Sequence, residues 1–136
     1  GWMGGKPLIL YVKLDDNLIF PAQILKFFVQ VKNQSNVVVK YLKLTFRRLI
    51  KDMEDKTLKS TMEDIRVIDY HQGAVFPLSA NADYKGYLEF KVPESIVPTN
   101  LQHKGYFERE YEFKIECIMG SLRRNVTVYV PVVVGK

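Results

Sequence analysis

Three side chains in this sequence have the chemistry to bind a metal ion or to attack a substrate: His71, His103 and Cys117. A zinc site needs three or four ligands, commonly in closely spaced pairs, and these three residues are far apart in the sequence. Cys117 lies in an alternating run, where it shares the apolar side with Ile115 and Met119. Because a reactive thiol needs an electropositive, partly open environment, this pattern predicts a small buried core residue instead. We expect both histidines in surface loops, and no catalytic residue, metal or cofactor.

Carboxylates occur in groups beside turn signals, at Asp15-Asp16, Asp52-Glu54-Asp55 and Glu63-Asp64. A glycosidase needs two carboxylates across a cleft, one with a raised pKa, whereas acids in turns are solvated. A further acidic stripe follows the outward side of one alternating run, at Glu108, Glu110, Glu112 and Glu116. We expect this stripe to pair with lysines of a neighbouring strand. The sequence has neither a glycine-rich phosphate loop nor a Gly-x-Ser-x-Gly motif, so an enzyme is the least favoured class.

Basic side chains gather in one part of the sequence, at Arg47, Arg48, Lys51, Lys56 and Lys59. If the chain folds back at Glu54-Asp55, these cations fall at one end of a sheet and form a site for phosphate groups or anionic lipid. The alternative is a solvated outer face. The net charge of +5 and the isoelectric point of about 9.3 favour anionic partners. Nucleic acid is not expected, because no basic run or known nucleic-acid-binding motif is present.

Apolar and polar residues alternate with period two along most of the chain, which is typical of half-buried β-strands, and helical periodicity is nearly absent. The clearest inward sides are Leu25, Phe27, Val29 and Val31; Leu42, Leu44 and Phe46; Tyr84, Gly86, Leu88, Phe90 and Val92; Tyr111, Phe113, Ile115 and Cys117; and Val126, Val128, Val130 and Val132. Short turns separate these runs. We therefore predict one all-β domain over residues 1–136, an immunoglobulin-like antiparallel β-sandwich of about seven or eight strands.

Two features of the pattern predict how particular strands are placed. The runs 25–31 and 42–46 flank the polar turn Asn33–Asn36, and this arrangement predicts a hairpin. A later run mixes apolar and polar residues, which suits a strand near a sheet edge. Such a strand offers unpaired backbone groups, so it is a candidate peptide-binding edge. Its residues are Ile65, Val67 and Asp69.

Composition narrows the setting in which this domain is expected to work. The chain has 136 residues, enough for one hydrophobic core, and no apolar run approaches the roughly 20 residues of a membrane helix. One cysteine allows no internal disulfide, and no signal peptide is visible, which favours a reducing compartment. The triplets Asn33-Gln34-Ser35 and Asn125-Val126-Thr127 match the N-glycosylation pattern, but such short matches arise often by chance.

Several segments, taken in order, resemble the C-terminal domain of arrestins, of the arrestin-domain-containing (α-arrestin) type. Phe20–Ile24 and Phe27–Ser35 resemble the opening strand of that domain, whose pattern ends in Asn-x-Ser/Thr. Val92–Thr99 is similar to a proline-flanked segment near its end, and Glu110–Ile115 to the strand that follows. Tyr129–Gly135 resembles the closing Pro-Ile/Val-x-Ile/Val-Gly pattern. The stretch Lys51–Asp83 carries no matching motif, and no Pro-Pro-x-Tyr ligase-recruiting motif is present.

The resemblance implies a β-sandwich and a non-enzymatic adaptor in the cytoplasm, in part at membranes. Its implied partners are membrane receptors or transporters and the proteins of trafficking, endocytosis, ubiquitination and signal transduction. It also implies contact with anionic groups, either phosphorylated tails or phospholipid. Because the family carries two sandwiches in tandem, the resemblance further implies an N-terminal arrestin domain in the full-length protein.

The sequence is therefore compatible with three functions. The first is an adaptor domain that recognises proteins through strand edges and loops. The second is a peripheral membrane module that binds anionic phospholipid through the basic cluster. The third is an extracellular immunoglobulin-like adhesion domain, which the glycosylation-like triplets suggest and which the single cysteine and the missing signal peptide oppose.

Overall fold

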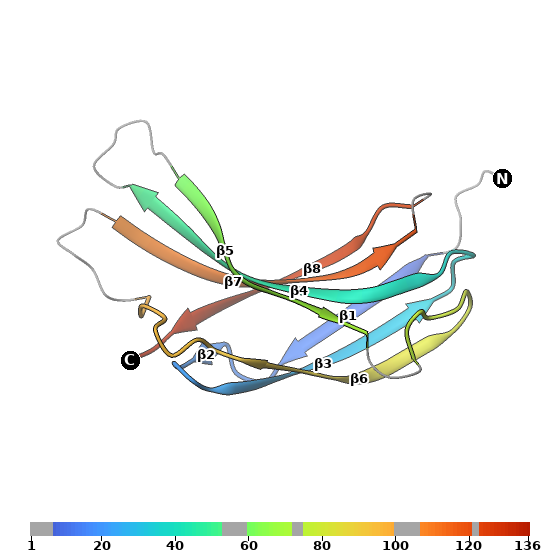
Figure 1. Ribbon diagram of the computed structural model, residues 1–136, viewed down its shortest axis with the longest axis horizontal. Helices are drawn as coiled ribbons and strands as arrows, with labels where there is room; N and C mark the ends of the chain where they lie inside the picture. The colour runs from blue at the N-terminus through green and yellow to red at the C-terminus, as the bar shows by residue number, and fades with distance from the viewer. Residues whose placement is uncertain (1–6, 53–59, 72–74, 100–106, 121–122) are drawn as a thin grey trace.

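The computed structural model, which describes residues 7–52, 60–71, 75–99, 107–120 and 123–136, contains eight strands in two layers (Figure 1). The strands are β1 (Leu8–Leu14), β2 (Leu18–Ile19), β3 (Ile24–Asn33), β4 (Val39–Asp52), β5 (Ser60–Tyr70), β6 (Asp83–Lys91), β7 (Phe107–Met119) and β8 (Val126–Val134). One sheet has the order β1-β3-β6 and the other β2-β8-β7-β4-β5. All pairings are antiparallel except that of the short β2 with β8. The all-β sandwich expected from the sequence is confirmed.

The period-two pattern is the reason these segments form strands. In β3 and β7 each alternate apolar residue is buried, as the sequence predicted, and the intervening residues face solvent. In β6, Gly86 lies on the inner side, where a Cβ atom would overlap the hydroxyl of Tyr84. The glycine therefore lets the Tyr84 ring lie flat across the strand. In β8 the inner valines are only half-buried until Val132 and Val134, because this strand tilts away from the centre of the sandwich.

Four phenylalanines join the two sheets at the centre of the core. Phe27 and Phe90 belong to the three-stranded sheet and Phe46 and Phe113 to the five-stranded sheet, and none is more than 1% exposed. The ring centroid of Phe113 lies 4.8 Å from that of Phe27, 4.7 Å from that of Phe46 and 5.1 Å from that of Phe90. Edge-to-face and offset ring pairs of this kind each add about 0.5–1.5 kcal/mol beyond the burial of apolar area. Phe113 is therefore the residue through which the two layers are most directly coupled.

The hairpin predicted from runs 25–31 and 42–46 is wrong. β3 pairs with β1 and β6, whereas β4 pairs with β5 and β7 in the other sheet. The polar turn between them is an arch from one sheet to the other, held by the fully buried side chain of Asn33. Its amide nitrogen donates to the carbonyl oxygens of Val37 (2.8 Å) and Ser79 (3.2 Å), and its oxygen accepts from Ser35. The same burial leaves this glycosylation-like triplet inaccessible in the folded domain.

The two sheets separate at one end of the sandwich. There β4 ends and β5 and β7 begin, and the three strands curve away from the three-stranded sheet (upper left in Figure 1). β8 runs instead toward β2 and the C-terminus. The segment after β6 fills part of the gap, because the hydroxyl of Tyr111 donates to the carbonyl oxygen of Val97 at 2.6 Å and the backbone nitrogen of Thr99 donates to that of Val134 at 2.9 Å. This open end carries Arg47, Arg48 and Lys51, three of the basic residues that the sequence analysis singled out.

Candidate functional site

The strand β5 is the last strand of the five-stranded sheet, so one of its two backbone edges has no neighbour in the sheet order. It pairs along its length with β4, from Tyr70 opposite Leu42 to Ser60 opposite Lys51. The register skips Ile65, which has no partner on β4 and forms a bulge. A bulge bends its strand and increases the local twist, and bulges occur preferentially at sheet edges and beside functional sites.

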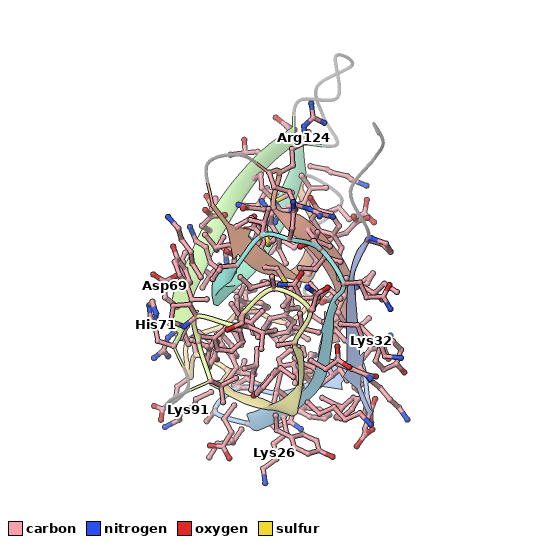
Figure 2. The ribbon with its side chains drawn as sticks, turned by 90° about the vertical axis from the view of Figure 1, so that its right-hand side faces the viewer. Lys26, Lys32, Asp69, His71, Lys91 and Arg124 are labelled. Carbon is pink, nitrogen blue, oxygen red and sulfur yellow. The ribbon has the colours of Figure 1, made fainter. Side chains whose placement is uncertain are left out.

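The bulge separates the three residues predicted as a peptide-binding edge. The side chain of Ile65 is half-buried and packs against the core together with Ile68. Val67 and Asp69 lie on the outer side, and 47% of the Val67 surface is exposed. Figure 2 shows Asp69 at the flank of the molecule. The outward side of this edge is therefore formed by Val67 and Asp69, with Ile65 anchoring the strand from behind.

Contacts on the inner side of β5 hold this edge strand in place. The hydroxyl of Tyr70 donates to the backbone carbonyl of Glu89 on β6, so it bridges the edges of the two sheets. The guanidinium of Arg66 lies 5.8 Å from the ring centroid of Phe90. Burial raises the pKa of the Tyr70 hydroxyl, which keeps this donor protonated through the neutral range. An edge fixed in this way pays little ordering entropy when a peptide joins it.

The basic cluster predicted as an anion site is only partly within the described residues, because Lys56 and Lys59 lie outside them. The other three cations do lie at the same end of β4, but they do not share a face. Arg47 faces outward and contacts the ring of Tyr129 at 5.3 Å. Arg48 lies on the inner side, near the buried Tyr111.

Each of these three cations already has a carboxylate partner on an adjacent strand. The ion pairs are Arg47–Glu112, Arg48–Glu63 at 2.7 Å and Lys51–Glu110 at 2.9 Å. The hydrogen bond that Arg48 donates to Glu63 raises the pKa of Arg48, and the one that Lys51 donates to Glu110 raises the pKa of Lys51. Any phosphate group would have to compete with these carboxylates. Two members of the acidic stripe pair across strands, Glu110 with Lys51 as expected and Glu112 with Arg47, whereas Glu116 pairs with Lys114 on the same strand.

The residues first considered for metal or nucleophilic chemistry are set apart from one another. Cys117 is fully buried, as its alternation predicted, and burial raises the pKa of its thiol from 9.0 to about 12. His71 is exposed at the end of β5, where its ring lies 4.6 Å from that of Tyr41. Within the described ranges, no three potential metal ligands come together. His103 lies outside those ranges.

Sequence reasoning missed a different surface, the outer face of the three-stranded sheet. Tyr11, Phe28 and Tyr87 form a row of rings across β1, β3 and β6, with centroids 6.2 Å and 5.6 Å apart. The signal was Phe28, an aromatic residue on the polar side of an otherwise alternating run. It is informative only once the register places Tyr87 opposite it, and that pairing joins segments nearly 60 residues apart.

The described residues thus form a 3 + 5 β-sandwich in which β5 is an edge strand. The family model for the C-terminal domain of arrestin (or S-antigen) matches residues 5–136, and the chain belongs to that family. Domains of this family generally serve as adaptors or scaffolds that bind partner proteins, and they are generally non-enzymatic.

One solved structure is similar across almost the whole chain. The crystal structure of Spo0M, a sporulation control protein from Bacillus subtilis, aligns with a TM-score of 0.71 at 12% identity. The alignment covers 98% of this chain and 51% of that chain, so the chain spans about half the length of Spo0M. At this identity the similarity establishes the fold alone. No curated protein matches the sequence significantly. The described residues contain no helix of the length and apolar character needed to cross a membrane.

Proposed function

We propose that this domain is a non-catalytic adaptor module of the cytoplasm that binds an extended segment of a membrane receptor or transporter along the edge of β5. The observation that carries the proposal is the position of β5 at the end of the five-stranded sheet, with a bulge at Ile65 and a fixed inner side. An extended peptide can form main-chain hydrogen bonds with such an edge, and its alternate side chains then contact the outward residues.

The side chains beside this edge supply the specificity in our proposal. Val67 offers an exposed apolar contact, and Asp69, two residues further along the same side, offers a hydrogen-bond acceptor. In the full-length protein we expect a preceding arrestin domain, and trafficking proteins are the expected further partners. These expectations rest on the family and on the half-length match to Spo0M.

Binding of phosphate or anionic lipid at Arg47, Arg48 and Lys51 is less well supported. All three are held by carboxylates, and two of the pairs are less than half exposed on both sides. An incoming anion must therefore displace a bound carboxylate before it gains a contact. We accordingly place peptide recognition first.

The proposal is tested with arrays of peptides from the cytoplasmic segments of receptors and transporters, followed by titration of the best binder. If the peptide adds to β5, the backbone amides of Ser60–Tyr70 that face away from β4 will exchange hydrogen more slowly in the complex. Val67→Asp is expected to weaken binding about tenfold by placing a charge at the apolar contact. The matched control is Val38→Asp, because Val38 is a valine of similar exposure, 42%, outside the β5 edge.

Two results would overturn this account. One is a peptide that binds with unchanged exchange in β5, which would locate recognition elsewhere on the domain. The other is equal loss of binding in the Val67 and Val38 variants, which would indicate a general effect of added negative charge. A failure of all peptides to bind would remove the support for an adaptor that works through this edge.

A further inference from the structure

The outer face of the three-stranded sheet combines exposed rings with lysines, two of which, Lys13 and Lys85, have no carboxylate partner among the described residues. Tyr87 is 60% exposed and Tyr11 49% exposed, with Phe28 half-buried between them. This is a large aromatic area to leave in contact with water. Tyrosine rings are favoured where one side of a surface is apolar and the other is wet, because the ring and its hydroxyl suit different environments.

Lysines surround this row of rings. Lys13 and Lys85 are exposed beside Tyr11 and Tyr87, and neither forms an ion pair within the described residues. Lys26 lies between the two shallow hollows that flank Tyr87, and its distance to Glu89 is 4.0 Å, at the limit for an ion pair. In Figure 2, Lys26 points away from the sandwich. The ammonium groups of Lys13 and Lys85 are therefore available to anions from outside the protein, whereas that of Lys26 is shared with Glu89 at the limit of an ion pair.

Two isoleucines complete the same face. Ile9 pairs with Lys32 at one end of the sheet and is 48% exposed, and Ile24 pairs with Lys91 at the other end and is 62% exposed. Aliphatic side chains gain nothing from stacking on nucleobases, and Lys32 and Lys91, which lie opposite the two isoleucines, would disfavour contact with an apolar protein surface. The headgroup region of an anionic bilayer is a surface with which aliphatic, aromatic and cationic side chains all interact favourably.

We propose that the outer face of β1, β3 and β6 is a docking surface for an anionic phospholipid membrane. Lys13, Lys26 and Lys85 contact lipid phosphates and carboxylates, while Tyr11, Tyr87 and Ile24 lie at the depth of the headgroups. The surface is on the opposite side of the sandwich from the paired cations of β4. The edge of β5 stays accessible in this orientation, so membrane docking and peptide binding are separable.

The first test is co-sedimentation of the chain with vesicles of phosphatidylcholine, with and without phosphatidylserine. We expect binding only to the vesicles that contain phosphatidylserine, and weaker binding at higher salt. Lys13→Gln with Lys85→Gln is expected to lower the partition coefficient about 30-fold, on the basis of the usual contribution of each basic residue near an anionic leaflet. Tyr11→Ser with Tyr87→Ser is expected to lower it about tenfold without changing the salt dependence.

The matched control removes two exposed charges from the other side of the domain, with Lys40→Gln and Arg124→Gln. Arg124 lies at the end of the molecule opposite Lys26 in Figure 2, and Lys40 lies on β4. Both substitutions keep the net charge equal to that of the Lys13 and Lys85 variant. We expect this control to bind vesicles within about threefold of the unmodified chain, because charges beyond a Debye length contribute little.

A second test reads out the orientation directly. Cys117 is fully buried, so a polarity-sensitive fluorophore can be attached to an introduced cysteine alone. A label at Gln30→Cys, which lies between Tyr11 and Lys85 in the register, is expected to shift to shorter wavelength on binding. A label at Val67→Cys on β5 is expected to show no shift.

The outcomes separate this proposal from its rivals and from the peptide-binding proposal. Equal loss of vesicle binding in the test and control variants would overturn it, as would a spectral shift at Val67→Cys only. Binding of an acidic peptide or single-stranded nucleic acid to this face, with no binding to vesicles, would overturn it in favour of that other partner. Failure of vesicle binding with intact peptide binding at β5 would remove this inference and leave the proposed function standing.

Discussion

The outer faces of the two sheets carry similar numbers of cations but differ in what those cations contact. On the five-stranded sheet, Arg47 and Lys51 are paired with glutamates of β7. On the three-stranded sheet, Lys13 and Lys85 have no acidic partner within the described residues, and exposed rings lie between them. Arg47 and Lys51 are thus neutralised within the protein, whereas Lys13 and Lys85 are available to an external anion.

The difference follows from which strands are neighbours. β4 is basic and β7 is acidic on the outward side, and their register places Arg47 directly opposite Glu112. In the other sheet the register places Glu89 opposite Lys26 and Asp83 opposite Lys32, whereas Lys13 lies opposite Phe28 and Lys85 opposite Gln30. Lys13 and Lys85 are therefore the lysines that this pairing does not neutralise. A basic cluster in a sequence therefore indicates a binding site only after its neighbours across the sheet are known.

The largest expected effect on stability comes from a substitution in the core that both sheets share. Phe113→Ala deletes a fully buried ring that contacts phenylalanines of both sheets. We expect the free energy of unfolding to fall by about 3–5 kcal/mol, and some of the protein to be unfolded at room temperature. Denaturant titration followed by circular dichroism measures the loss. A loss below about 1 kcal/mol would contradict the central place given to this residue.

A smaller loss of stability is expected on the neutralised face. Arg47→Met keeps most of the aliphatic stem but leaves the carboxylate of Glu112 without its partner, and it also removes the contact with Tyr129. We expect a loss of about 1–2 kcal/mol. Adding Glu112→Gln should restore part of it, because the isolated charge is then gone, and the double-mutant cycle gives the coupling. A coupling energy of zero would indicate that the ion pair does not contribute to stability and that Arg47 is available to bind an external anion.

The stability of the domain at alkaline pH tests whether Cys117 is buried in the core between the two faces. Burial raises the pKa of Cys117 from 9.0 to about 12, so above pH 9.0 the unfolded chain ionises while the folded thiol stays neutral. Ionisation of the thiol has little effect on stability below pH 9.0 and lowers the free energy of unfolding increasingly up to about pH 12, by at most about 1.4 kcal/mol per pH unit. Unfolding of Cys117→Ala at several pH values isolates the effect, since Tyr70 and Tyr84 titrate alike in both proteins. A difference that does not narrow as pH rises would contradict the burial.

The smallest effect on stability is expected on the open face. Lys13→Gln and Lys85→Gln remove exposed charges that have no partner, so each should change the free energy of unfolding by less than about 0.5 kcal/mol. The same thermal or denaturant measurement as for Arg47 gives the comparison. A larger loss would mean that these lysines contribute to the fold, and vesicle data on them would then need a structural interpretation.

The alternation of apolar and polar residues was sufficient to predict the strands and most of the core residues. The inward positions of β3 and β7 and the burial of Cys117 follow from alternation alone, because each strand has one face toward the opposite sheet. The pairing of β3 with β4 was predicted wrongly because a short polar turn is equally compatible with a hairpin and with an arch. The buried hydrogen bonds of Asn33 decide between them, and they involve Ser79, which is 46 residues away.

The candidate sites were harder to predict for the same reason. Nothing in the run around Ile65 reveals that this residue is skipped in the register, so the sequence could not separate its role from that of Val67. The row of Tyr11, Phe28 and Tyr87 depends on contacts between three distant strands. The resemblance to arrestins supplied the fold but no contacts, and the middle of the chain, which matched no motif, contains the edge strand.

The most direct test of the division between the two faces compares two double variants in one vesicle assay with phosphatidylserine at physiological salt. Arg47→Gln with Arg48→Gln removes two charges from the paired cluster, and Lys13→Gln with Lys85→Gln removes two from the open face. Near-ultraviolet circular dichroism confirms that each variant is folded. We predict that only the Lys13 and Lys85 variant loses binding. A larger loss in the Arg47 and Arg48 variant would contradict this account and place the anion site on β4, where the sequence alone had put it.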